Sequence, residues 1–205
     1  MRQCAVLGVF SALACLAGPS LAAAMTFHRI DAAAFCATDP CVVASGEIDQ
    51  DTAEEFTDFI TIADVPSGAT VMFDSPGGSL LAGLALGRAI RRAGFYTAVG
   101  RYDSDNERLK NGGRCASACA YAFLGGVQRG VGRHARLGVH QFANRQDAQK
   151  PISVGEARLL TAAVERYTEQ MVGKAAILNL AAGTPPWRTY WLSSDELRAH
   201  HVVTD

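Results

Sequence analysis

The sequence contains no uninterrupted apolar run long enough to cross a bilayer, which takes about 20 residues, so no stable membrane span is expected. It has no basic tract and no interleaved basic and aromatic side chains, and its formal net charge is −1. A nucleic-acid partner is therefore not expected. It also lacks internal repeats and low-complexity tracts. With 205 residues, 49% of them hydrophobic and 19% charged, the chain has the balance of a globular protein of one domain.

Residues 1–24 are expected to be a signal peptide that is removed on export. Arg2 supplies the positive charge typical of such leaders, and an apolar run extends from Ala5 to Ala17. The small residues of 22–24 provide a cleavage site. The mature domain, residues 25–205, is then expected in the periplasm or outside the cell.

Four cysteines remain after the leader: Cys36, Cys41, Cys115 and Cys119. An even number in an oxidising compartment indicates disulfides, and four cysteines allow three pairings. Proximity in sequence favours Cys36 with Cys41 and Cys115 with Cys119, whereas cross-pairing would tie the amino-terminal segment to the rest. Neither spacing is CxxC, so no metal site is expected, nor is another cofactor.

Strands and helices alternate along the mature chain, which predicts a single α/β domain with right-handed crossovers. The expected strands are 41–48, 69–73, 95–99, 129–131 and 137–140. The expected helices begin at 51 and 79, span 117–124 and 153–180, and end with a short one from 193. Strand 69–73 is wholly apolar, as is typical of a strand inside a parallel sheet.

Several boundaries have their own local signals. A capping box, in which a glutamate follows the N-cap by three residues, is predicted at three helix starts. The pairs are Asp51 with Glu54, Ser153 with Glu156, and Ser193 with Glu196. Ser-Pro-Gly-Gly at 75–78 indicates a turn before a helix capped by Ser79. The polar residues 101–114 are expected to form a surface insertion, and residues 143–151 a polar loop.

Three short motifs carry candidate chemistry. Ser117 lies between two alanines at a helix start, Gly77 and Gly78 follow a strand and open a helix, and His140 ends a later strand. A serine nucleophile needs a neighbouring base, and its acyl intermediate needs N–H donors for an oxyanion. Each motif alone has a simpler explanation, as an N-cap, a turn and a hydrogen-bonded strand histidine. Since such groups gather where strands end and helices begin, we expect the three to meet in one site.

In this order, Ser-Pro-Gly-Gly-Ser-Leu at 75–80, Ala-Ser-Ala at 116–118 and Val-His-Gln at 139–141 resemble motifs of the ClpP/crotonase superfamily. The likeness runs from about residue 42 to the end, and is greatest to exported ClpP-like serine peptidases of proteobacteria. It implies a ClpP/crotonase-like α/β fold, a spiral of ββα units with a mostly parallel sheet.

The same resemblance assigns roles to residues. It implies that Ser117 is the nucleophile, that His140 is the base, and that the N–H groups of Gly78 and Ala118 form the oxyanion hole. The substrate would be an extended peptide or protein bound by strand addition, without ATP. Assembly into a homo-oligomer is possible, but it does not follow from the resemblance.

The third member of the expected triad is missing. Where such proteases have an aspartate, this sequence has Thr189, and Thr189, a backbone carbonyl or a water is left to orient His140. Loss of a triad aspartate can lower turnover about 10⁴-fold. The alternative to a serine hydrolase is therefore a weak or inactive relative that binds peptides or a partner protein. Crotonase-type thioester chemistry is a third reading, against which export and the serine–histidine pair both argue.

Overall fold

The computed structural model describes residues 23–31, 38, 40–110, 112–143, 152–173 and 176–204. Its strands are β1 (Thr26–Ile30), β2 (Cys41–Ile48), β3 (Thr70–Gly78), β4 (Tyr96–Val99), β5 (Arg101–Asp103), β6 (Arg108–Lys110), β7 (Arg114–Ala116), β8 (Arg129–Val131), β9 (Arg136–Val139) and β10 (Tyr190–Trp191). Its helices are α1 (Thr52–Ile62), α2 (Leu80–Ala93), α3 (Ala118–Phe123), α4 (Val154–Val172), α5 (Ala176–Ala182) and α6 (Ser194–Ala199). Almost all of the predicted signal peptide falls outside these residues and stays a prediction. No helix in the described ranges is long and apolar enough to span a bilayer.

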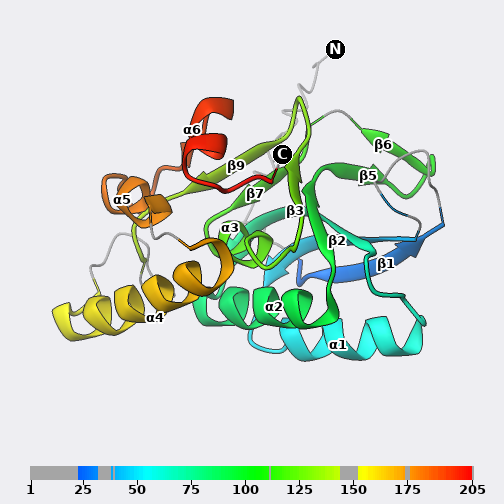
Figure 1. The fold of residues 1–205 in the computed structure, drawn as a ribbon, viewed down its shortest axis with the longest axis horizontal. Helices are drawn as coiled ribbons and strands as arrows, with labels where there is room; N and C mark the ends of the chain where they lie inside the picture. Colours follow the sequence, from blue (N-terminus) through cyan, green and yellow to red (C-terminus); the bar gives the residue numbers. More distant parts are fainter. Residues whose placement is uncertain are drawn as a thin grey trace, which may run out of the picture.

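The strands form a mostly parallel sheet that divides at β3. β3 pairs in parallel with β2 along its length and with β4 over its first half, and Ser75 further along pairs in parallel with Cys115 of β7. Beyond β7 the sheet continues to β9 in parallel and then to β10 in antiparallel register. Figure 1 shows α1 and α2 side by side along one face. The predicted single α/β domain with a mostly parallel sheet is confirmed.

The core lies between the sheet and the helices on its face. Its largest fully buried side chains are mainly aromatic and aliphatic, among them Phe56, Phe73, Phe95, Phe123 and Tyr167. The rings of Phe56 and Phe95 meet edge to face, with centroids 6.0 Å apart. Burial of such side chains gives about 1.5–3 kcal/mol each, so this cluster is the main source of cohesion.

The predicted turn at residues 75–78 is wrong, because β3 runs on through Gly78. Glu47 and Ile48 of β2 pair with Gly77 and Gly78, after an irregularity in β2. An added Cβ at Gly78 would lie 2.1 Å from the carbonyl oxygen of Ile48, so a larger residue could not approach β2 this closely. Ser79 does occupy the N-cap position of α2, as predicted, although its hydroxyl makes no capping bond.

The capping box predicted at Asp51 is also wrong. Asp51 has helical backbone angles, and its side chain makes no capping bond. The Asp49 carboxylate caps the helix instead. It accepts from the backbone N–H of Thr52 at 3.1 Å and from the Thr52 hydroxyl at 2.7 Å. These hydrogen bonds, the one from the Thr52 hydroxyl foremost, lower the pKa of Asp49.

The other two capping predictions differ in outcome. Ser193 and Glu196 form the complete reciprocal box at the start of α6, as predicted. At α4 only half of the box forms, with the Ser153 hydroxyl accepting from the N–H of Glu156 at 3.2 Å.

Two segments have more structure than predicted. The helix predicted over 153–180 is divided, because Gly173 in the left-handed region ends α4 and α5 begins at Ala176. The predicted insertion at 101–114 contains an antiparallel hairpin of β5 and β6. Most of the expected polar loop at 143–151 lies outside the described residues.

Candidate active site

Ser117 lies between β7 and α3 in a backbone conformation that is unfavourable for serine, with φ 57° and ψ −123°. Its N–H donates to the carbonyl of Gly138 at 2.9 Å, and its carbonyl accepts from Ala120 at 3.0 Å. A residue other than glycine in such a region costs about 1–3 kcal/mol and persists only where its surroundings hold it. Ser117 occupies the N-cap position of α3, but its half-buried hydroxyl makes no capping bond. Helix capping therefore does not explain this serine.

The end of β3 lies directly against Ser117. An added Cβ at Gly77 would lie 2.8 Å from the Cβ of Ser117 and 3.1 Å from the backbone nitrogen of Ala118. Gly77 also has a φ of 104°, a conformation that side chains disfavour. Glycine at this position therefore allows β3 to lie this close to Ser117 and to the backbone nitrogen of Ala118.

His140 follows β9, and its ring is held by the next residue of the chain. Its Nδ1 lies 2.6 Å from the carbonyl oxygen of Gln141. Because a carbonyl only accepts hydrogen bonds, Nδ1 carries the proton, and Nε2 of the neutral ring is left as an acceptor. A backbone carbonyl, one of the three groups considered for orienting His140, thus contacts its ring.

Gln141 is fixed by the segment at the end of α5. Its N–H donates to the carbonyl of Thr184 at 2.8 Å, and its Nε2 donates to the carbonyl of Ala182 at 2.6 Å. The carbonyl that contacts His140 therefore belongs to a residue anchored at two points. Nothing in the sequence indicated this role for Gln141, because a main-chain carbonyl leaves no signal in residue type.

Thr189 lies beside the same strand. Antiparallel pairing matches Tyr190 with Val139, and one step further along this register Thr189 is opposite His140. Its methyl group packs over Gly138, where an added Cβ would lie 2.5 Å from Thr189 Cγ2. Thr189 therefore lies next to β9 with its methyl group against Gly138, and its role in place of an aspartate stays a prediction.

One cavity of about 240 Å³ brings the separate motifs together. It is lined by Gly78, Ser79, Leu80, Leu81, Ser117, Tyr121, His140, Gln141, Phe142, Ala143, Glu156 and Leu160. Ser117, His140 and Gly78 thus share one cavity, although they come from three different parts of the chain. Ala118 is buried and is not among the residues that line it. A second cavity of about 340 Å³ between α4 and α5 shares Gln141 and Phe142 with the first.

Tyr121 is a residue of this site that the sequence did not suggest. It lies one helical turn after Ser117 and lines the same cavity, a spacing from which it could have been found. Its hydroxyl is buried with no hydrogen-bond partner among the residues that the structure describes, and burial raises the pKa of Tyr121 strongly. The Tyr121 carbonyl, in contrast, accepts from the buried hydroxyl of Tyr167 at 2.8 Å.

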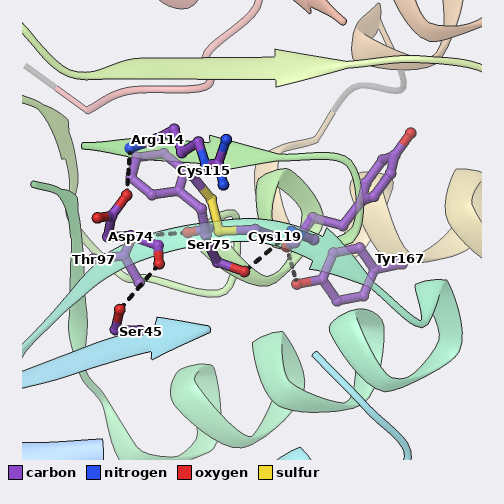
Figure 2. Close-up of a disulfide and its surroundings, with 11 residues drawn as sticks. Ser45, Asp74, Ser75, Thr97, Arg114, Cys115, Cys119 and Tyr167 are labelled. Carbon is purple, nitrogen blue, oxygen red and sulfur yellow. Dashed lines mark hydrogen bonds between the residues drawn. A yellow bond between two sulfur atoms is a disulfide. The ribbon is translucent and has the colours of Figure 1, made fainter. Parts of the chain in front are cut away.

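The strand that leads to Ser117 is tied to its neighbours at both ends. The Asp74 carboxylate accepts from the side chain of Arg101 at 2.7 Å and from the backbone N–H of Arg114 at 3.0 Å, so it joins β3 to the start of β7. The hydrogen bond with Asp74 raises the pKa of Arg101. At the other end a disulfide joins Cys115 to Cys119, with Cα atoms 5.2 Å apart (Figure 2).

The Cys115–Cys119 pairing confirms one of the predicted disulfides. Cys41 is also disulfide-bonded, while Cys36 lies outside the described residues, so its pairing stays a prediction. Within the described part of the chain, no three histidine, cysteine or acidic side chains are grouped so as to hold a metal ion.

No protein-family model and no curated protein matches this sequence. Several solved structures match its fold. The chain aligns with ClpP1 from Listeria monocytogenes at a TM-score of 0.55 and 20% identity, covering 77% of this chain and 84% of that one, and a point mutant of the same protein aligns equally well. The ClpP protease catalytic domain from Plasmodium falciparum aligns at a TM-score of 0.53 and 18% identity, covering 77% and 78%. The fold of this chain is therefore that of ClpP protease catalytic domains.

Proposed function

We propose that this chain is an exported serine hydrolase, acting on extended peptides without ATP, with Ser117 as nucleophile and His140 as base. One observation carries the proposal. Ser117, His140 and Gly78 line a single cavity although they lie on three separate segments. Serine, histidine and a glycine-lined approach are the parts that acyl transfer requires.

In the proposed reaction, Nε2 of His140 takes the hydroxyl proton of Ser117 as Oγ attacks the peptide carbonyl carbon. The carbonyl oxygen becomes an oxyanion, His140 returns the proton to the leaving amine, and water then hydrolyses the acyl-serine by the same route. The tautomer with Nδ1 protonated suits this role, because it leaves Nε2 free to accept.

The oxyanion would be bound by the N–H groups of Gly78 and Ala118. Ser79 donates its N–H to Ile48 of β2 at 2.7 Å. Gly78 lines the same cavity as Ser117, which supports its N–H as one of the two donors. The backbone nitrogen of Ala118 lies 3.1 Å from where a Gly77 Cβ would be, so the end of β3 approaches this second donor closely.

The walls of the cavity favour an apolar side chain beside the scissile bond. Leu80, Leu81, Phe142 and Leu160 are large apolar residues among those that line it. A volume of about 240 Å³ is sufficient for one side chain and not for a folded segment. We therefore expect cleavage of flexible or unfolded chains after an apolar residue.

A weak or inactive peptide-binding relative is the second candidate, and one observation favours it. Thr189, a neutral residue, is opposite His140, where a carboxylate would stabilise the imidazolium. A carbonyl can orient the ring, but it offers less charge than an aspartate. In this reading the same cavity would hold peptides without cleaving them.

The test is hydrolysis of fluorogenic peptides by the mature chain, residues 25–205, with Ser117→Ala and His140→Ala beside it. Ser104→Ala, on the exposed hairpin tip, is the matched control. We expect turnover by the wild type and the control and loss in the two site variants. Turnover that survives Ser117→Ala would exclude the nucleophile, and peptide binding without turnover in the wild type would favour the second candidate.

A further inference from the structure

We propose that the Cys115–Cys119 disulfide positions the Ser117 nucleophile, so that the hydrolase is competent only when this bridge is closed. The proposal rests on the proposed function for its consequence in activity. Its structural part, that the bridge holds the serine, can be tested separately.

The bridge spans the nucleophile itself. Cys115 belongs to β7 and Cys119 to the first turn of α3, and the ring that they close contains Ala116, Ser117 and Ala118. Both half-cystines are fully buried. Cys115 is also paired on both sides, with Ser75 of β3 and with Leu137 of β9, so the first end of the bridge is anchored in the sheet (Figure 2).

The closed ring restricts the conformations open to Ser117. A chain extended over the four steps from Cys115 to Cys119 would span about 13 Å, whereas the bridge holds their Cα atoms 5.2 Å apart. Since pairing in the sheet keeps Cys115 extended, the chain must reverse direction between Ala116 and Ala118. The positive φ of Ser117 makes this reversal.

Two hydrogen bonds hold this conformation beside the bridge. The Ser117 N–H donates across the sheet to the carbonyl of Gly138 in β9, and the Ser117 carbonyl accepts from the N–H of Ala120 within the turn. Without the bridge, relaxation of Ser117 to an ordinary backbone conformation would move its hydroxyl and the Ala118 N–H together. These are the two groups on which attack and oxyanion binding depend.

The bridge links activity to the redox state of the compartment. When a small dithiol reduces the bridge, it passes two electrons and two protons to Cys115 and Cys119, which become thiols, and is itself oxidised to a disulfide. The oxidised form of such a dithiol closes the bridge during folding by the reverse exchange. Because both sulfurs are buried in the folded domain, the bridge resists reduction once closed, so oxidation before or during folding sets the active state.

The experiment compares the mature wild type with Cys115→Ala/Cys119→Ala, in which the Cys41 disulfide is left in place. Amide hydrogen exchange at Ser117 and Ala120 reports on the turn, and exchange at Leu86 and Ile90 of α2 reports on the rest of the fold. The rate of fluorophosphonate labelling reports on the nucleophile. If the first variant does not fold, Cys115→Val/Cys119→Ala replaces it in the comparison, because valine restores part of the side-chain volume lost at Cys115.

We expect faster exchange at Ser117 and Ala120, unchanged exchange in α2, and labelling at least about tenfold slower, because small misplacements of reacting groups cost about 10²-fold. A folded variant that exchanges and labels like the wild type would overturn the proposal. Faster exchange at the turn in a protein whose wild type is not labelled would support the positioning role while excluding the proposed function.

Discussion

Nδ1 of His140 lies 2.6 Å from the carbonyl oxygen of Gln141, the residue that follows it in the chain. In the proposed site, a main-chain carbonyl thus contacts the ring nitrogen that a carboxylate contacts in a serine protease. It fixes the tautomer of the ring without adding a negative charge, so we expect a slow enzyme. The orientation of the His140 ring should then depend on how firmly Gln141 is held.

Gln141→Ala is predicted to lower kcat several-fold and to leave KM nearly unchanged. The substitution removes the bond from Nε2 to the Ala182 carbonyl but keeps the backbone carbonyl that contacts His140. Loosening of that carbonyl affects the step in which His140 moves a proton more than it affects binding. Steady-state kinetics beside Gln128→Ala, a substitution at an exposed glutamine that lines neither cavity, test this. A change in KM alone would mean that Gln141 only contacts substrate.

Thr189→Asp is predicted to raise turnover and to move the acid limb of the kcat/KM profile to higher pH. The β-sheet register places residue 189 opposite His140, and a carboxylate there favours the imidazolium. Thr189→Asn, which has the same shape without the charge, should leave the profile in place. If both variants have the profile of the wild type, residue 189 does not face the histidine.

Gly77→Ala is predicted to abolish hydrolysis and to destabilise the fold by about 1–3 kcal/mol. The new Cβ would lie 2.6 Å from the Ala116 carbonyl and 2.8 Å from the Ser117 Cβ. The matched control is Gly155→Ala in the first turn of α4, where nothing lies within 4 Å and the exchange should be neutral or mildly stabilising. Thermal unfolding and peptide hydrolysis separate the two effects. An active Gly77→Ala variant would show that the space beside Ser117 is not used.

Two buried tyrosines are predicted to respond in opposite ways to loss of the hydroxyl. Tyr121→Phe removes a buried group that has no partner and should leave stability equal or higher. Tyr167→Phe removes the donor to the Tyr121 carbonyl and should cost about 0.5–1.5 kcal/mol. Urea unfolding of the pair measures the contrast. A clear loss of stability in Tyr121→Phe would mean that its hydroxyl has a bound partner.

The hairpin of β5 and β6 is predicted to loosen in acid. Lys110, at 2.9 Å, and Asn106, at 2.7 Å, bind the Asp103 carboxylate and lower its pKa from 3.8 to about 2. A carboxylate whose pKa is lowered by folding stabilises the fold above pH 3.8, and this contribution is lost as the pH falls from there toward 2. An NMR titration of the hairpin amides checks this, and Asp103→Asn should remove the pH dependence. Hairpin signals that do not change over this range would contradict it.

Much of the fold was predictable because its signals are local. The apolar run in β3 and the reciprocal capping box at Ser193 are read from neighbouring residues, and both are present. The path through Gly77 and Gly78 was not predictable, since Pro-Gly-Gly is locally a turn and only pairing with β2 keeps it extended. At Asp51 the capping pattern is present in the sequence, but the carboxylate of Asp49 accepts the hydrogen bond from the N-terminus of the helix.

The site divides in the same way. Ser117 and His140 were suggested by residue type and order, and the cavity that they share follows from how parallel strands end in this sheet. The Gln141 carbonyl and the Tyr121 hydroxyl were not suggested. One is a main-chain atom, and the other belongs to a residue type that usually lies in the core for its ring alone.

The most direct test of the central claim is the site of covalent attachment of a fluorophosphonate. The mature protein would be labelled and digested, and the modified residue identified by mass spectrometry, with His140→Ala in parallel. The account predicts one phosphonyl group on Ser117, formed much more slowly in the His140 variant. A wild type that stays unmodified, or that is modified at another residue, would contradict it.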